Sequence, residues 1–328
     1  MAVKTHLSLN EIRSMLERYP VGKVFSASEI QAGTVQSNFR IEAEMGTYVL
    51  RLYESRTMEQ VSFEAALIRK LTACGFPTPK LVEAENRRIH SILGKPYCLY
   101  AFAKGTHVSV LNRQQEESLI QTMAELARIT RSLHLPGKET RISYQPDCME
   151  KLACQKAECL GTENAVQKFA WYQQQLRKLI LPDGMAMGIC HCDYDLSNIL
   201  FHDGKVSALL DFDDANYTWA LFDFASSTNF FRKDFSHESW NQFQRDDPIL
   251  DFTEARRRMA IYIRHCEVSK TDRLHLFDLA KLGILVDCIW YFERGEWQDF
   301  YERRKIEALD AYGRDHFYQS VFGELQYE

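Results

Sequence analysis

A hairpin signal near the middle of the chain constrains the fold more than any other feature. Asp203-Gly204 separates two strand-like runs, residues 198–202 and 205–210. This dipeptide favours a two-residue turn between antiparallel strands, because both of its residues tolerate a positive φ. The sequence therefore predicts an antiparallel β-hairpin over 198–210.

The register of this hairpin predicts which polar side chains meet. The turn pairs His202 with Lys205. Counting back from the turn then places Asn198 opposite Leu209. Asp211 lies one diagonal step beyond Asn198 on the same face, roughly 7–8 Å away. An amide oxygen and a carboxylate at this separation suit Mg²⁺, which completes its shell with water and phosphate oxygens.

A third polar residue stands just before the hairpin. Asp193 precedes Asn198 by five residues, where a carboxylate can accept the proton of a hydroxyl that approaches a metal-bound nucleotide. Turn and cap positions also favour Asp, and Asp193, Asp195 and Asp211 taken singly fit that use equally well. Their combination with the hairpin register favours phosphoryl transfer.

The same segment resembles the catalytic loop of the aminoglycoside phosphotransferase and choline kinase superfamily. The signature of that superfamily is His-Gly-Asp-x-x-x-x-Asn, followed by a hydrophobic strand and Ile-Asp. The matching residues are His191, Asp193, Asn198 and Asp211, while Cys192 replaces the usual glycine. Glycine adopts torsions that cysteine adopts only at a cost, so this departure bears on the backbone of the loop.

The resemblance implies a role for each matching residue. Asp193 would be the catalytic residue, and Asn198 and Asp211 would bind Mg²⁺. Asp223, in Leu221-Phe222-Asp223-Phe224-Ala225, matches a later family aspartate that braces the catalytic loop. Asp223 and His191 are therefore expected to be structural supports. The implied cofactors are ATP and Mg²⁺.

The first part of the chain predicts a small antiparallel sheet. Strand-like runs cover residues 37–43 and 47–53. The loop over 31–37 would lie over the nucleotide phosphates, with Gly33 and Ser37 offering a backbone N–H and a hydroxyl. A plain hairpin without a ligand would have the same pattern.

A helix is predicted over 58–74, because Thr57 and Gln60 form a capping box at its start. Glu64 lies on the apolar stripe of this helix, where a carboxylate is costly unless it is paired. Arg51, on the preceding strand, is the expected partner. Kinases use a strand cation and a helix glutamate to position the α- and β-phosphates, although family members usually have Lys at this strand position. An ordinary structural ion pair would use the same two residues.

A further strand over 97–102 would end in a hinge. Backbone groups around Tyr100 and Phe102 would then hydrogen-bond to adenine, although an edge strand without a ligand would look identical. Residues 1–103 are thus expected to form a nucleotide-binding lobe. Residues 104–328, with a mainly helical period, are expected to form the second lobe with the hairpin and an acceptor pocket. Among its acidic residues Glu293, Glu296 and Asp299 fit either amine recognition or a solvated helix face.

Composition narrows the function classes. The chain has 328 residues and a net charge of −5, with no concentrated basic stripe of the kind that binds nucleic acid. Its nine cysteines are an odd number without a secretory leader, which favours reduced thiols and a cytoplasmic location. The most apolar late stretch, 282–292, is too short to span a bilayer. Adjacent ligands such as Cys190-His191-Cys192 rarely chelate one zinc ion. No membrane or nucleic-acid partner is expected.

These features predict an α+β, two-lobed protein-kinase-like fold, with a small antiparallel β-sheet lobe carrying one helix and a larger, mainly helical lobe. The amino-terminal stretch through Tyr19-Pro20-Val21-Gly22 to Ser37-Asn38-Phe39 is also similar to type II homoserine kinases, which belong to the same superfamily. The resemblance implies an ATP-dependent transfer of the γ-phosphate to a hydroxyl of a small molecule, with homoserine or a related amino alcohol as the expected acceptor.

Three alternatives remain open at this point. An aminoglycoside or choline-type kinase would use every one of these catalytic residues. A protein kinase is disfavoured because the Asp-Phe-Gly, His-Arg-Asp and Ala-Pro-Glu motifs are absent from the sequence. A catalytically silent, kinase-like structural protein would not need the aspartates and Asn198. The sequence predicts neither the acceptor, nor a preference for ATP over GTP, nor the oligomeric state.

Overall fold

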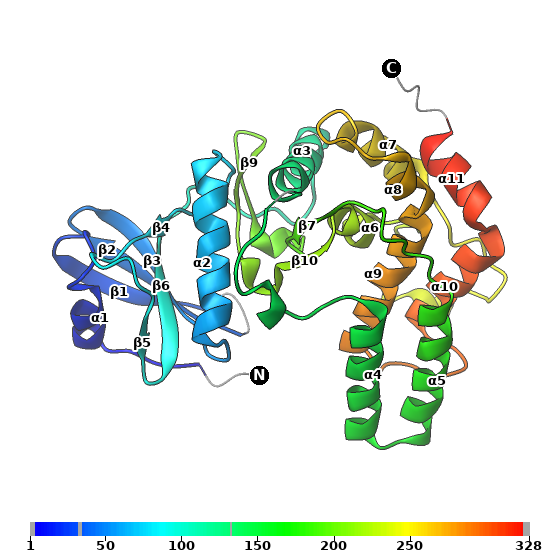
Figure 1. Cartoon of the computed structure of the whole chain (residues 1–328), viewed down its shortest axis with the longest axis horizontal. Coiled ribbons are helices and arrows are strands. Elements are labelled where there is room, and N and C mark those ends of the chain that lie inside the picture. The colour runs from blue at the N-terminus through cyan, green and yellow to red at the C-terminus, as the bar shows by residue number, and fades with distance from the viewer. Residues whose placement is uncertain (1–3, 32–34, 132, 324–328) are drawn as a thin grey trace. The chain divides into compact units, whose positions relative to one another are not determined.

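The computed structural model describes residues 4–31, 35–131 and 133–323 (Figure 1). Its backbone contacts separate into two compact units. The first unit comprises Met1–Gln115, His134–Arg141 and Asp195–Asp213, and the second comprises Glu116–Leu133, Ile142–Tyr194 and Asp214–Glu328. The predicted lobes over 1–103 and 104–328 stay a prediction. The contacts divide the chain differently, because residues 104–115, His134–Arg141 and the hairpin segment Asp195–Asp213 group with the first unit.

The first unit is built on a six-stranded antiparallel sheet, in which the order is β1-β2-β3-β6-β4 and β5 pairs with β6. The strands are β1 (Val24–Ile30), β2 (Ser37–Ala43), β3 (Gly46–Leu52), β4 (Leu81–Val82), β5 (His90–Ile92) and β6 (Lys95–Ala101). Successive strand residues point to opposite faces. Leu50 and Leu52 therefore join the buried cluster with Ile12 of α1 (Leu9–Leu16), while the Tyr53 hydroxyl donates to Glu64 of α2 (Met58–Ala73) on the other face.

Helix α2 confirms the predicted capping box. The Thr57 side chain accepts from the backbone N–H of Gln60, and the Gln60 side chain accepts from the backbone N–H of Thr57. The helix ends at Ala73 with Cys74 as its C-cap, and Gly75 follows with φ +77°. A left-handed residue at this position is a common helix stop, and glycine adopts it without strain.

The hairpin of β8 (Ile199–His202) and β9 (Lys205–Leu209) confirms the predicted turn. Asp203 and Gly204 both have positive φ, at +48° and +74°, as a two-residue turn of this kind requires. His202 pairs with Lys205 as expected. The β-bulge that follows at Leu200 and Phe201 was not foreseen.

The second unit is mainly helical. Its α-helices are α3 (Arg113–Thr130, whose first turn belongs to the first unit), α4 (Pro146–Leu160), α5 (Glu163–Arg177), α6 (Phe222–Ser227), α7 (Thr253–Tyr262), α8 (Lys270–Leu274), α9 (Leu276–Trp290), α10 (Tyr301–Tyr312) and α11 (Arg314–Phe322). Strands β7 (Met187–Cys190) and β10 (Asn216–Trp219) form a two-stranded antiparallel sheet. Short 3-10 helices lie at Lys138–Thr140, Leu196–Asn198, Phe212–Asp214 and Trp240–Gln242.

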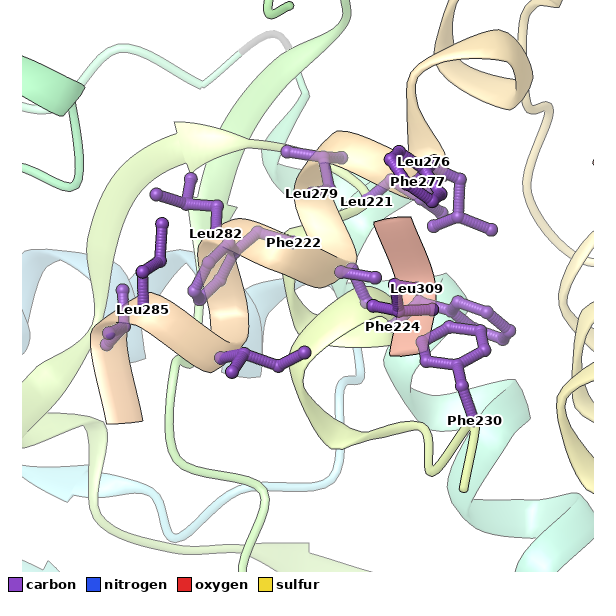
Figure 2. Packing of buried hydrophobic residues seen from close by; sticks show 14 of the residues in the cluster. Leu221, Phe222, Phe224, Phe230, Leu276, Phe277, Leu279, Leu282, Leu285 and Leu309 are labelled. Atoms are coloured by element: carbon purple, nitrogen blue, oxygen red, sulfur yellow. The ribbon is translucent and has the colours of Figure 1, made fainter. Parts of the chain in front are cut away.

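Helix α9 is the centre of the core in the second unit. Nearly all of its residues are buried, which is expected of a helix that is apolar on every side. Figure 2 shows Leu279 and Leu282 of α9 among the aromatic side chains Phe222 and Phe224 of α6. No helix in the described part of the chain is long and apolar enough to cross a membrane.

Candidate functional site

The loop that carries Asp193 is fixed by one buried carboxylate. Asp223, at the start of α6, is 4% exposed. Its Oδ2 accepts from the backbone N–H of His191 and its Oδ1 accepts from that of Cys192, at 2.8 Å each. The fully buried His191 in turn accepts from the backbone N–H of Asp193 through Nδ1, at 3.2 Å. Asp223 and His191 thus hold the backbone on which Asp193 stands.

Cys192 keeps the backbone conformation that glycine would adopt. Its φ is +68°, which costs a non-glycine residue about 1–2 kcal/mol. Two contacts hold it there, namely the bond from its N–H to Asp223 and a contact of 3.4 Å between its Sγ and the Asn216 amide. The cysteine therefore strains the loop without changing its course.

Burial sets the protonation of the groups around this loop. Burial raises the pKa of Asp223, while the charge of His191 and the two backbone N–H bonds oppose that shift. Burial also raises the pKa of the Cys190 and Cys192 thiols. The part of the chain that the structure describes holds no group of three or more His, Cys, Asp or Glu side chains that could bind a metal ion.

The predicted register at Asn198 is wrong by one residue. Asn198 lies opposite Leu210 and not Leu209, since the backbone N–H of Leu210 donates to the backbone oxygen of Asn198 at 2.8 Å. The bulge at Leu200 and Phe201 causes the shift. The sequence pattern of the hairpin gives no sign of this bulge, beside which Thr106, distant in sequence, forms a bridge with Phe201. Asp211 directly follows Leu210, so the register no longer places Asp211 on the same sheet face as Asn198, as the sequence had predicted. Both oxygen donors nevertheless lie at the same end of the hairpin.

Asp211 is the ion-pair partner of Arg51, which corrects the predicted partner Glu64. The Arg51 Nη2 donates to Asp211 Oδ1 at 2.7 Å and lies 4.0 Å from Asp213 Oδ2. No Arg51–Glu64 ion pair within 4.0 Å occurs among the described residues. Asp211 has φ +59° and a side chain that is 38% exposed. Its carboxylate therefore combines solvent access with a strained backbone, a pairing typical of functional positions.

Glu64 is instead bound by two tyrosines. It is 3% exposed, and its Oε1 accepts from the hydroxyls of Tyr53 and Tyr100 at 2.8 and 3.3 Å. Burial raises the pKa of Glu64, although the charge of Arg51 opposes the shift. The position of Glu64 on the apolar stripe of α2 predicted correctly that its carboxylate is buried and hydrogen-bonded. It did not predict that the partners are tyrosine hydroxyls and not the Arg51 guanidinium.

Asp213 is a residue of this cluster that sequence reasoning missed. Its carboxylate accepts from Arg56 Nε at 2.8 Å, Arg56 Nη2 at 3.1 Å and Gln36 Nε2 at 2.8 Å. Arg141 donates to the backbone oxygens of Phe212, at 3.0 Å, and Asp213. The signal was present as three acidic residues directly after the β9 strand, only one of which was assigned a role.

The predicted nucleotide contacts are placed as follows. Gly33 lies outside the described residues. Ser37 is buried, and its hydroxyl donates to Glu54 and accepts from the backbone N–H of Thr5. Because the hydroxyl already forms these two hydrogen bonds, a contact with phosphate is not favoured. At the hinge, Tyr100 is within β6 and the backbone N–H of Phe102 donates to the Thr47 oxygen at 3.1 Å.

The acidic residues expected near the acceptor take different places. Glu293 and Glu296 are exposed. Asp299 accepts from Arg304 Nε at 2.5 Å, and hydrogen bonding to Arg304 lowers the pKa of Asp299. An aspartate held in this way is already paired, so Asp299 fits a structural ion pair better than an amine site.

Comparison with known proteins places these residues in a family. Residues 26–262 match the APH phosphotransferase enzyme family. A curated homoserine kinase of Burkholderia ambifaria (strain MC40-6) is 23% identical to this chain, over 97% of the chain and 93% of that protein.

Solved structures show the same fold. An amicoumacin kinase, solved in complex with AMP-PNP, Ca²⁺ and Ami, superposes with a TM-score of 0.60 at 14% identity, over 94% of each chain. A choline kinase from Cryptosporidium parvum Iowa II superposes with a TM-score of 0.60 at 10% identity, over 97% of this chain and 96% of that one. These likenesses confirm the predicted protein-kinase-like α+β fold and the resemblance on which it was based.

Proposed function

The chain belongs to the APH phosphotransferase enzyme family, and on that premise we propose that it moves the γ-phosphoryl group of ATP to a hydroxyl group of a small amino alcohol. Membership confirms the prediction of a small-molecule kinase. The observation that carries the finer proposal is the fixed loop at residues 191–193, where Asp223 binds two consecutive backbone N–H groups. Such bracing supports a carboxylate that must be positioned for proton transfer.

In the proposed reaction, the acceptor hydroxyl oxygen bonds to the γ-phosphorus while the bond from that phosphorus to the β,γ-bridging oxygen breaks. ADP leaves with the electron pair of the broken bond, and the hydroxyl proton passes to a carboxylate oxygen of Asp193. Positioning and charge neutralisation supply most of the rate in such transfers. Asp193 thus acts chiefly by orienting the hydroxyl.

Asn198 and Asp211 fit Mg²⁺. An amide oxygen and a carboxylate are hard donors, and Mg²⁺ is commonly held by one or two carboxylates together with water and phosphate oxygens. A solvent-accessible Asp211 side chain suits a site that nucleotide oxygens complete. When bound, the ion supplies neutralisation of the negative charge that develops on the phosphate oxygens.

Arg51 would offset the charge of the phosphates that are not transferred. A guanidinium keeps its charge and can fork onto both a carboxylate and a phosphate. Its bond to Asp211 at 2.7 Å places it beside a proposed metal ligand. Glu64 would support the sheet through Tyr53 and Tyr100. Gly33, Tyr100 and Phe102 remain the proposed nucleotide contacts, whereas Ser37 is disfavoured because its hydroxyl already bonds to Glu54 and Thr5.

Homoserine is the acceptor that we propose first. The curated relatives that align with nearly the whole chain are named homoserine kinases. An aminoglycoside or choline is the second candidate, since kinases of those substrates share the fold. The presence of Asp193, Asn198 and Asp211 argues against a catalytically silent protein.

A coupled assay of ADP release tests the proposal, with homoserine, choline, methylthioribose and a set of aminoglycosides as acceptors. Release above the acceptor-free rate with homoserine supports the first candidate, and release only with an aminoglycoside or choline supports the second. Failure of every acceptor with ATP and Mg²⁺ refutes the proposed activity.

Substitution of Asp193 tests its role. We expect Asp193→Asn to lower kcat by about 10²–10⁴-fold, because the amide cannot accept the proton, while calorimetry shows unchanged ATP affinity. Asp203→Asn is the matched control, since asparagine also suits a hairpin turn of this type and the Asp203 side chain is 90% exposed. Equal kcat values for Asp193→Asn and the wild type would refute the assignment.

A further inference from the structure

Two opposite charges in the second unit are left without close partners. Asp287 lies on α9 and Lys305 lies on α10, two helices that pack on each other. Among the described residues, neither side chain has a hydrogen bond or an ion pair within 4.0 Å. The Lys305 ammonium instead lies 4.8 Å from the ring centre of Phe231 and 4.9 Å from that of Tyr301. Asp287 is exposed and Lys305 is partly exposed, so both charged groups are accessible to a bound ligand.

The position of α9 brings Asp287 toward Asp193. Gly283 lies one turn before Asp287 on the same face of α9, and a Cβ at Gly283 would meet the Ser226 Cα of α6 at 3.1 Å. Helix α6 also carries Asp223, which binds the backbone of the Asp193 loop. Desolvation raises the pKa of Asp287, Lys305 opposes the shift, and the negative charge of Asp193 adds to it. Asp193 and Asp287 are therefore electrostatic neighbours.

A buried carboxyl beneath this pair leaves the lysine charge available. Glu302, one turn before Lys305 on α10, is 3% exposed, and its Oε1 has no hydrogen-bond partner. Among the described residues, the only ion-pair nitrogen within 4.0 Å of that oxygen is His237 Nε2, at 3.7 Å. Burial raises the pKa of Glu302 to about 7, so below neutral pH this carboxyl is mostly protonated. Burial lowers the pKa of Lys305, and the charges of Asp287 and Glu302 oppose that shift. When Glu302 is protonated, Asp287 is therefore the charged neighbour that favours the ammonium form of Lys305.

We infer that Asp287 and Lys305 bind the acceptor, with Asp287 taking its ammonium group and Lys305 taking its carboxylate. The inference rests on the proposed role of Asp193 as the residue that receives the hydroxyl proton. A cation, an anion and a proton acceptor together match the three polar groups of a hydroxyl-bearing amino acid. Choline and aminoglycosides carry no carboxylate, so they would leave Lys305 unpaired. The acceptor class is therefore a zwitterionic amino acid with a side-chain hydroxyl.

Three alcohols of one chain length test this inference by ADP release. Homoserine has both charged groups, 3-aminopropan-1-ol lacks the carboxylate, and 4-hydroxybutanoate lacks the ammonium group. For the wild type we expect kcat/KM to fall about 10- to 100-fold when either group is missing, the usual effect of one charge-assisted contact. In Lys305→Met the preference for homoserine over 3-aminopropan-1-ol should shrink to within about threefold. In Asp287→Asn the preference over 4-hydroxybutanoate should shrink likewise.

Matched controls separate binding from folding. Lys151→Met and Asp183→Asn change the same residue types at exposed positions and should retain both preferences, and all four variants should keep the wild-type melting temperature within a few degrees. If Lys305→Met or Asp287→Asn unfolds, the neutral polar variants Lys305→Gln and Asp287→Ser replace them, with the same shift in preference expected.

The outcomes distinguish this inference from the proposed function. Turnover of homoserine with preferences that survive both substitutions overturns the inference and leaves the kinase proposal standing, as does turnover of choline or an aminoglycoside alone. If no acceptor is turned over, calorimetric titration of homoserine decides the inference independently. Binding to the wild type that Lys305→Met abolishes supports it, and the absence of binding overturns it.

Discussion

The two compact units hold their aspartates by different means. In the second unit, Asp223 is sealed from solvent and accepts from two backbone N–H groups. In the first unit, Asp211 has a side chain that is 38% exposed and pairs with the side chain of Arg51. A backbone donor cannot leave its acceptor without a change in the chain path, whereas an arginine side chain can move to another anion.

The difference teaches which parts of the site are fixed and which are exchangeable. The loop that carries Asp193 is fixed before any substrate arrives. The Arg51–Asp211 ion pair is expected to rearrange when nucleotide binds. In the proposed reaction Arg51 contacts phosphate and Asp211 binds Mg²⁺. We therefore expect substitutions in the fixed region to affect folding and turnover together, and substitutions in the exchangeable region to affect chiefly nucleotide affinity.

The largest effect is expected for Asp223→Asn. The amide oxygen can accept from one backbone N–H, but the amide nitrogen would then face the other donor in a buried place. The free energy of unfolding should fall by about 2–4 kcal/mol, measured by urea denaturation, and kcat should fall with it. Asp246→Asn, at an exposed position, is the control. A stable variant with wild-type kcat would show that the loop needs no such support.

Glu302 adds to this comparison a buried carboxyl that is held neither by two backbone N–H groups nor by an arginine side chain. Burial raises its pKa from 4.5 to about 7, so folding favours the protonated form. Its contribution to stability is complete below about pH 4.5 and is lost as the pH rises through about 7. Between these limits the wild type should lose roughly 3 kcal/mol relative to Glu302→Gln. Urea denaturation of both proteins from pH 5 to 8 measures this, and a constant difference between them would contradict it.

Arg51→Met should act mainly on the nucleotide. Loss of the guanidinium removes the ion pair with Asp211, but that carboxylate is partly hydrated, so the unfolding free energy should change by only about 1 kcal/mol. The KM for ATP should rise about 10- to 100-fold, the value of one charge-assisted contact to phosphate. Arg69→Met removes another sheet-side ion pair, with Glu83, and should leave the KM for ATP unchanged. A large loss of stability with an unchanged KM for ATP would show that Arg51 contributes to folding and not to nucleotide binding.

The smallest effect is expected at Cys192. Both Cys192→Ala and Cys192→Gly remove the thiol, so comparing the two isolates the backbone conformation at φ +68°. Glycine relieves about 1–2 kcal/mol of strain and costs about 0.5–1 kcal/mol of chain entropy. The glycine variant should therefore be more stable than the alanine variant by about 0.5–1 kcal/mol in urea denaturation. A more stable alanine variant would mean that the loop is unstrained there.

Local signals in the sequence predicted local structure well. The turn at Asp203 and Gly204 and the cap at Thr57 depend on neighbouring residues alone, and both are present. The position opposite Asn198 was missed because the turn signal does not reveal the bulge between the turn and Asn198. The partner of Arg51 was missed for a related reason. Periodicity predicts the helix face on which a side chain lies, but it does not predict which neighbour on that face forms the hydrogen bond. The hydroxyls of Tyr53 and Tyr100, and not Arg51, bind Glu64.

The close contact of Gly283 with Ser226 limits how this protein can diverge. Any larger residue at 283 would force α9 away from α6, so natural or laboratory selection for new substrates has little freedom along that helix. Helix α10 carries the partly accessible Lys305, one of the two residues inferred to bind the acceptor. Libraries intended to alter acceptor choice should therefore randomise α10 first.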